Sequence, residues 1–185
     1  CQSSSNVIVT EQTNLPTVAI NAPGQITCTT AAVTLDGSGS SGGDNYLWTT
    51  SDGNIVSGAD TANPVVDAVG TYILTITNVG SGCSNTANIV VSEDITPPIA
   101  VATAGGNIDC NTTEIALNGG GSDTPPNFDI LWTTTNGNIL FGETTLTPVV
   151  GAAGTYTLEV TSLSNGCVTN ASVDVTEDLT APLVD

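Results

Sequence analysis

Short segments in which apolar and polar residues alternate recur along this chain. Examples are 33–35, 71–77 and 87–92, and Gly, Asn, Asp or Pro residues bound each of them. Alternation with a period of two predicts β-strands that bury one face. No stretch of ten residues keeps a helical period, so we expect an all-β protein.

Turn-forming dipeptides interrupt the alternation at matching places. Asp52-Gly53 and Asn136-Gly137 each follow a segment that contains a tryptophan. Such dipeptides favour two-residue hairpin turns. We therefore expect a hairpin turn directly after each tryptophan strand.

The chain contains an internal repeat, which is the strongest pattern in it. Residues 48–99 align with residues 132–183 without a gap, and 25 of the 52 pairs are identical. Farther upstream the offset falls from 84 to 82, which matches Cys28 with Cys110. The two extra residues of the second repeat fall in its Gly-rich stretch.

The repeat sets the expected domain boundaries. We expect one immunoglobulin-like repeat at 16–97 and another at 98–181. Residues 1–15 match the last strand of a preceding repeat, and residues 182–185 match the start of a following one. The chain therefore reads as part of a longer array.

Each repeat has the length and strand spacing of an immunoglobulin-like sandwich, which uses about seven short strands. A single tryptophan, Trp48 or Trp132, lies on the expected third strand among β-branched residues. We expect both to pack in the core rather than to form a sugar-stacking platform. Gly-Thr-Tyr at 70–72 and 154–156 precedes the expected sixth strand, where such folds place a tyrosine corner.

Several motifs carry a family resemblance. The first repeat reads V-T-L-D-G-S-G-S-S, W-T-T-S-D-G-N-I-V-S-G, D-A-V-G-T-Y-I-L-T-I-T and S-E-D-I-T-P-P. These motifs resemble the PKD-like and Ig-like tandem repeats of very large surface proteins of Bacteroidota-type bacteria. The resemblance implies tandem immunoglobulin-like (PKD-like) β-sandwich domains in extracellular stalks, adhesins or fibres.

The second repeat departs from these motifs at two acidic positions. Asn118 and Asn136 stand where the first repeat has Asp36 and Asp52. We therefore expect that any role of Asp36 or Asp52 is not shared by both repeats.

Composition narrows the possible functions. The chain has 185 residues, 18 Asp plus Glu and no Lys, Arg or His, so its net charge is −18. Without basic side chains it cannot neutralise a phosphate backbone, and we expect no nucleic-acid partner. A His-based triad and a Schiff-base lysine are excluded, and we expect no enzyme activity. No run of 18 apolar residues occurs, so we expect no insertion into a membrane.

The five cysteines indicate disulfides in an oxidising compartment. Two pairings are open. The first joins Cys28 to Cys83 and Cys110 to Cys167 within repeats. The second joins Cys28 to Cys167 between repeats, and leaves Cys83 and Cys110 to repeats outside this chain. In both, the partner of Cys1 lies upstream.

Strand direction bears on the choice between these pairings. In an immunoglobulin-like sandwich the chain enters at one pole and leaves at the other, which places Cys28 and Cys83 about one strand length apart. A strand of seven residues spans roughly 23 Å, whereas a disulfide needs Cα atoms within about 7 Å.

Paired carboxylates mark the expected repeat junctions. They are Glu93 and Asp94 at the first junction, and Glu177 and Asp178 at the second. Ca²⁺ takes six to eight oxygen ligands, so we expect a Ca²⁺ site at these junctions or, alternatively, solvated linker residues. No other cofactor is expected.

Three positions match glycosylation patterns. Asn111 and Asn170 begin Asn-x-Ser/Thr sequences. Thr61 lies in Asp60-Thr61-Ala62, which resembles the sequence that the same bacterial group glycosylates on oxygen.

These observations lead to a functional hypothesis. We expect a structural repeat segment of an extracellular cell-surface fibre, stalk or adhesin, which acts as a stiff cross-linked spacer. Its partners would be neighbouring repeats of the same long chain, or other copies in a filament. The alternative is a polysaccharide- or ligand-binding Ig-like module of a secreted adhesin or enzyme.

Overall fold

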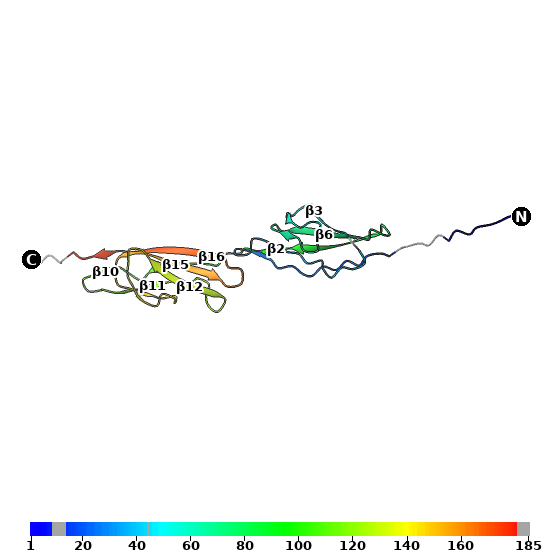
Figure 1. Ribbon diagram of the computed structural model, residues 1–185. Coiled ribbons are helices and arrows are strands. Elements are labelled where there is room, and N and C mark those ends of the chain that lie inside the picture. Colours follow the sequence, from blue (N-terminus) through cyan, green and yellow to red (C-terminus); the bar gives the residue numbers. More distant parts are fainter. Residues whose placement is uncertain (9–13, 44, 181–185) are drawn as a thin grey trace, which may run out of the picture. The chain divides into compact units, whose positions relative to one another are not determined.

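The computed structural model describes residues 1–8, 14–43 and 45–180, and every regular element in this part is a strand. The chain forms two units (Figure 1). The first comprises Cys1–Ile26 and Thr30–Asp94, and the second comprises Thr27–Thr29 and the chain from Ile95 onward. Residues 182–185, the expected start of a following repeat, lie outside the described residues.

Two three-stranded sheets make up the first unit, in the orders β2-β5-β4 and β3-β6-β7. Their strands are β2 (Val33–Thr34), β3 (Asn45–Thr50), β4 (Ile55–Ser57), β5 (Val65–Val66), β6 (Gly70–Thr77) and β7 (Ser84–Val91). Two short strands, β1 (Ile26–Thr27) and β8 (Glu93–Asp94), form a separate pair.

The second unit repeats this arrangement with one more edge strand. Its sheets have the orders β13-β14-β11-β9 and β12-β15-β16, and β10 pairs with β17 in parallel. The strands are β9 (Thr103–Ala104), β10 (Ile108–Asp109), β11 (Ile115–Asn118), β12 (Phe128–Thr134), β13 (Ile139–Phe141), β14 (Val149–Val150), β15 (Gly154–Ser162), β16 (Val168–Val175) and β17 (Glu177–Asp178).

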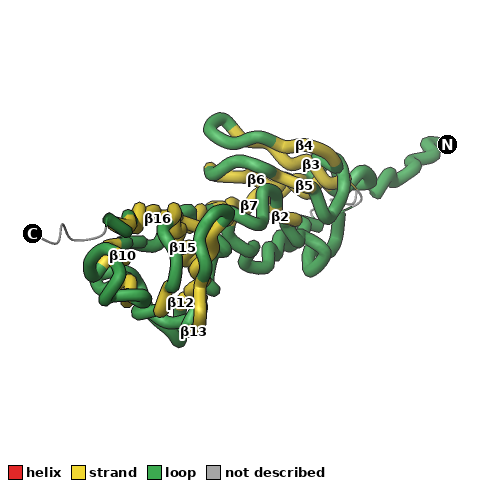
Figure 2. The backbone as a smooth tube through the Cα atoms, turned by 90° about the vertical axis from the view of Figure 1, so that its left-hand side faces the viewer, coloured by secondary structure: helices red, strands yellow, loops and turns green. Residues whose placement is uncertain are grey.

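Alternating burial explains why these segments form two-layered units. Along β6, Tyr72, Leu74 and Ile76 are buried, whereas Ile73 between them is 41% exposed. The buried residues pack with Val66 from the other sheet in one apolar cluster. The second unit has an equivalent cluster, so each unit is an immunoglobulin-like β-sandwich with its own core, as the alternation predicts. Figure 2 shows the strands and their loops.

Both tryptophans lie in these cores. Trp48 and Trp132 are each 1% exposed. Each indole N–H donates to a backbone oxygen at 3.0 Å, that of Thr61 or that of Thr145. The expectation of core packing is confirmed, and a buried indole offers no platform for a sugar.

The tyrosine corner is present in both units. The Tyr72 hydroxyl donates to the Ala68 oxygen at 2.7 Å and accepts from the Asn54 N–H at 3.0 Å. The Tyr156 hydroxyl donates to the Ala152 oxygen, also at 2.7 Å.

The predicted hairpin turns at Asp52-Gly53 and Asn136-Gly137 are wrong. β3 and β4 belong to different sheets, so residues 51–54 cross from one layer to the other. Neither Gly53 nor Gly137 has a positive φ, which a type I′ turn requires. The crossing is instead held to β6, where Asp52 Oδ1 accepts from the Thr71 N–H at 2.9 Å.

No helix that could cross a membrane occurs among the described residues.

Candidate functional site

A disulfide joins Cys28 to Cys167, with Cα atoms 5.0 Å apart. The two residues are 139 positions apart and come from different sequence repeats. Cys28 lies in the segment Thr27–Thr29, which belongs to the second unit. Of the two pairings open from the sequence, the structure contains the one between repeats.

The pairings Cys28–Cys83 and Cys110–Cys167 are therefore absent, and strand direction explains why. Cys83 directly precedes β7, whereas Cys28 directly follows β1, whose partner β8 begins beyond the far end of β7. β7 is eight residues long, and such a strand spans roughly 26 Å. A disulfide needs Cα atoms within about 7 Å.

Cys167 ends a tight turn at 162–167, which we call the closed turn. Its backbone is held by bonds from the Ser162 N–H to the Cys167 oxygen at 2.8 Å and from the Gly166 N–H to the Ser162 oxygen at 2.9 Å. The Cys167 N–H also donates to Asn165 Oδ1 at 3.0 Å. Cys167 is only 1% exposed and Asn165 only 4% exposed.

Gly166 allows the closed turn to receive Thr29. Its φ is +70°, a left-handed conformation that favours glycine. A Cβ at this position would collide with the Thr29 side chain, whose Oγ1 would lie 2.7 Å away. The glycine therefore supplies both the turn conformation and the space that the segment Thr27–Thr29 occupies.

The first unit has the same turn at 78–83, which we call the open turn. The Asn78 N–H donates to the Cys83 oxygen at 2.9 Å, and the Gly82 N–H donates to the Asn78 oxygen at 2.8 Å. The Cys83 N–H donates to Ser81 Oγ at 3.2 Å. Here Cys83 is a free, half-buried thiol. Apart from the two residues next to Gly82 in the chain, no described residue has an atom within 4 Å of the position that a Cβ would take at Gly82.

The second unit in turn carries its own equivalent of the Cys28 segment. Strands β10 and β17 pair Ile108 with Glu177 and Asp109 with Asp178. Asp109 is the last residue of β10, and its Oδ1 accepts from the backbone N–H groups of Asn111 and Thr112, both at 2.7 Å. These bonds hold the pKa of the Asp109 carboxyl below its usual value.

These bonds shape the loop that contains Cys110. Cys110 lies between Asp109 and Asn111 as an exposed, free thiol. Cys1 is also free and exposed.

The junction carboxylates lie in the short paired strands. Glu93 and Asp94 form β8, and Glu177 and Asp178 form β17. The Thr180 side chain donates to Asp178, which lowers the pKa of that carboxyl. No group of three or more His, Cys, Asp or Glu residues suited to a metal ion occurs among residues 1–8, 14–43 and 45–180. Ca²⁺ at these junctions stays a prediction.

The expectation that Asp36 and Asp52 have no shared role needs correction. Asn136 Oδ1 accepts from the Thr155 N–H at 2.9 Å, as Asp52 Oδ1 does from its own equivalent partner, the Thr71 N–H. An amide oxygen replaces a carboxylate oxygen as the acceptor, so the structural role is shared and only the charge differs.

An asparagine also replaces an aspartate as hydrogen-bond acceptor at the start of the Gly-rich loop, where Asn118 stands in place of Asp36. Asp36 accepts bonds from Ser38, Asn21 and Asn63, which hold the pKa of its carboxyl well below the usual value, with Ser38 contributing most. Its counterpart Asn118 accepts from the Gly120 N–H at 2.8 Å.

The three candidate glycosylation residues lie on the surface. Asn111 follows Cys110, and Asn170 lies on β16. Thr61 is exposed, but its hydroxyl donates to the Gly58 oxygen at 2.8 Å within a turn that Thr145 repeats in the second unit. The turn accounts for this threonine, and glycosylation at all three positions stays a prediction.

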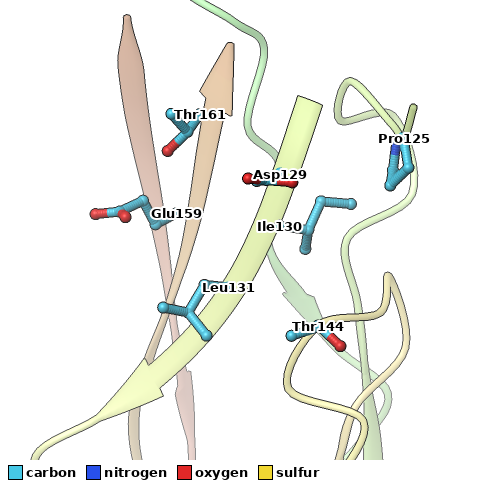
Figure 3. Close-up of a pocket in the computed structure, with 7 residues that line it drawn as sticks. All are labelled: Pro125, Asp129, Ile130, Leu131, Thr144, Glu159 and Thr161. Atoms are coloured by element: carbon cyan, nitrogen blue, oxygen red, sulfur yellow. The ribbon is translucent and has the colours of Figure 1, made fainter. Parts of the chain in front are cut away.

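A surface hollow of about 400 Å³ lies on the second unit. Figure 3 shows that Asp129 and Leu131 come from β12 and Glu159 from the neighbouring β15. The first unit has a hollow whose lining residues all lie 84 positions before residues of this one: Asn45, Tyr46, Leu47, Asp60, Thr75 and Thr77. The hollow thus belongs to the fold of the repeat.

The chemistry of the two hollows differs. Asp129 and Glu159 are replaced by Asn45 and Thr75 in the first unit. The two hollows therefore share a position in the fold but not a set of binding groups.

Sequence reasoning missed the glycine and the threonine that fit together at the disulfide. Gly166 belongs to a Gly-Cys dipeptide that both repeats share, at 82–83 and 166–167, and Thr29 carries no motif. The observation that two repeats both place glycine before cysteine was the available signal.

No protein-family model matches this chain, and no curated protein matches it. Solved structures with similar folds include three N-terminal domains of the bacteriophage RB49 outer capsid protein Hoc, at 16% identity and a TM-score of 0.44 over 88% of this chain. Murine CEACAM1b is similar at 13% identity and a TM-score of 0.37, over 88% of this chain and 100% of that one.

The adhesin InvE of Yersinia pseudotuberculosis is similar at 17% identity and a TM-score of 0.25, over 89% of this chain and 59% of that one. The chain also spans 59% of the Hoc chain. Identities this low concern the fold alone.

Proposed function

We propose that this chain is a structural segment of an extracellular surface fibre, stalk or adhesin, in which it acts as a stiff, cross-linked spacer. The observation that carries the proposal is the Cys28–Cys167 disulfide, which ties a segment of the first sequence repeat to the second unit. A covalent tie in addition to the chain itself restricts the motion of a junction between repeats.

Three further features support this role. Disulfides persist mainly in oxidising compartments, which favours an extracellular location. The motifs quoted above resemble PKD-like repeats of large bacterial surface proteins. The tryptophans are buried, so the chain lacks the indole platform that a sugar-binding module would use.

The stiffness of the purified chain tests the proposal. Replacing both bonded cysteines (Cys28→Ser with Cys167→Ser) should broaden the distance distribution measured by small-angle X-ray scattering, because one of two covalent connections is lost. The matched control replaces the two free thiols, Cys83→Ser with Cys110→Ser, and should scatter like the unmodified chain. Equal distributions for all three proteins would overturn the spacer role.

A further inference from the structure

The two repeats carry the same two kinds of cysteine position, but the structure uses only one of each. Cys28 follows a strand of a β1–β8 type pair, and its partner Cys167 ends the closed turn. The two remaining cysteines also represent one position of each kind, since Cys110 follows β10 and Cys83 ends the open turn. Both are free.

The open turn is already shaped for a partner. Its two backbone bonds match those of the closed turn to within 0.1 Å, 2.9 and 2.8 Å against 2.8 and 2.9 Å. Gly82 has φ +71°, against +70° for Gly166. At Gly166 the space beside the α-carbon is filled by Thr29, whereas at Gly82 no described atom fills it.

Burial differs in the way that a missing partner predicts. Cys167 is buried and Cys83 is half-buried, although both end turns of the same geometry. The additional burial of Cys167 therefore comes from the docked segment and not from the turn.

The segment around Cys110 is also formed in advance. The strand before it is held by a bond from the Ile108 N–H to the Thr176 oxygen at 3.0 Å, as the strand before Cys28 is held by the Ile26 N–H to the Ser92 oxygen at 3.0 Å. Asp109 fixes the loop that follows. Cys110 is thus presented on the surface much as Cys28 is.

We propose that Cys110 of one copy of this chain forms a disulfide with Cys83 of a second copy, with the segment at 109–111 docked on the open turn. The inference rests on the proposed function and names the partner of its cross-links. The Cys28–Cys167 bond runs from the segment of one repeat to the turn of the repeat that follows it, and a second copy supplies such a following turn to Cys110. Because donor and acceptor surfaces differ, the contact is heterologous and propagates into a chain of copies.

The bond forms by thiol–disulfide exchange with a small-molecule disulfide such as oxidised glutathione. The Cys110 thiol loses its proton and attacks one glutathione sulfur, which releases one glutathione as thiolate. The Cys83 thiolate then attacks the Cys110 sulfur of this mixed disulfide and releases the second glutathione. Two protein thiols are oxidised to one disulfide, one molecule of oxidised glutathione is reduced to two glutathiones, and the two protons of the protein thiols pass to the released thiolates.

A mixing experiment tests the proposal on the full chain, with the exposed Cys1 replaced by Ser throughout. One variant carries Cys83→Ser and keeps Cys110, and the other carries Cys110→Ser and keeps Cys83. With oxidised glutathione, we expect a species of doubled mass on a non-reducing gel from the mixture, and monomer from each variant alone. The chain that keeps both thiols should give a ladder of higher multiples.

The bond is located by peptide mass. Trypsin finds no site in this chain, but cleavage after Asp and Glu places all five cysteines in separate peptides. The expected product joins 68–93 to 110–114. A link between 12–36 and 160–174 in the same digest shows that the Cys28–Cys167 bond is intact.

Two results would overturn the inference. One is the absence of dimer in the mixture, and the other is as much dimer from the Cys83→Ser variant alone, which keeps Cys110, as from the mixture. Both leave the spacer proposal standing, because that proposal depends on scattering from the Cys28–Cys167 variants. Gly82→Asn adds a steric test, since Asn tolerates a positive φ but fills the space beside the turn. We expect it to reduce the dimer yield without changing the melting temperature of the monomer, and an unchanged yield would contradict docking on the open turn.

Discussion

The closed turn at 162–167 and the open turn at 78–83 have the same backbone hydrogen bonds and the same left-handed glycine. Yet Cys167 is bonded and buried, whereas Cys83 is free and half-buried. The repeat therefore builds the turn by itself, and a partner segment adds the burial and the bond. The turn motif therefore takes this geometry whether or not a partner segment is bound to it.

The largest expected effect comes from removing the bond itself. Cys28→Ser with Cys167→Ser should lower the free energy of unfolding of the second unit by about 2–5 kcal/mol, because the unfolded chain regains the entropy that the disulfide removes. Cys83→Ser with Cys110→Ser should have little effect. Urea unfolding followed by tryptophan fluorescence measures both, since each core contains one tryptophan.

Variants with Trp48→Phe or Trp132→Phe assign each transition to its unit. Equal losses for the bonded and the free pairs would show that the two turns do not differ as described.

Next in size is a matched pair of glycine substitutions. Gly82→Ala should cost about 1–2 kcal/mol, because a left-handed conformation is unfavourable for alanine. Gly166→Ala should cost about 1–3 kcal/mol more, because its Cβ also collides with Thr29. Chemical unfolding of the two variants gives the difference, and equal costs would contradict the docking of Thr29 on the closed turn.

A smaller, pH-dependent effect separates Asp36 from Asn118. The pKa of Asp36 is lowered in the folded unit by its hydrogen bonds, chiefly from Ser38. The stabilisation that the Asp36 carboxylate gives the first unit is therefore present above the unfolded pKa of about 3.9, and it is lost as the pH falls towards the folded pKa. Asp36→Asn should make the first unit less stable at neutral pH and less sensitive to acid.

Urea unfolding at a series of pH values from neutral to acidic checks this effect, and Asn118→Asp is the reciprocal variant in the second unit. An Asp36→Asn protein that keeps the full acid sensitivity of the unmodified first unit would contradict the assignment.

The smallest expected effect is that of calcium. Both junctions carry a Glu-Asp pair, so Ca²⁺ at a few times its Kd should stabilise both units by about 1 kcal/mol. Melting temperatures in Ca²⁺ and in a chelator measure this, with Asp94→Asn and Asp178→Asn as controls. Identical melting curves in the unmodified chain would refute the calcium prediction.

Much of the fold followed from local patterns. The alternation around Tyr72 and Leu74 predicted buried strands, and the Gly-Thr-Tyr sequence predicted the tyrosine corner, because both depend on neighbouring residues. The hairpin at Asp52-Gly53 was wrong because a dipeptide does not say which sheet the next strand joins. The Asp52 bond to Thr71, which directs the crossing, spans 19 positions.

The candidate site was predictable only in part. The repeat showed which cysteines occupy equivalent positions, and the strand directions of an immunoglobulin-like sandwich argued against disulfides within a repeat. The glycine that precedes cysteine in both repeats marked the turn, but nothing in the sequence identified Thr29 as the residue that fits against Gly166, since small polar residues are common throughout this turn-rich chain.

The amino-acid sequence alone determined an all-β chain without basic residues, with two similar repeats and a tryptophan in each core. These properties follow from periodicity, composition and self-similarity, which are local or additive. Only the tertiary structure decided that Cys28 bonds Cys167 while Cys83 and Cys110 stay free. Disulfide pairing depends on which Cα atoms come within a few ångströms, and for residues 139 positions apart that distance is set by the packing of the folded chain.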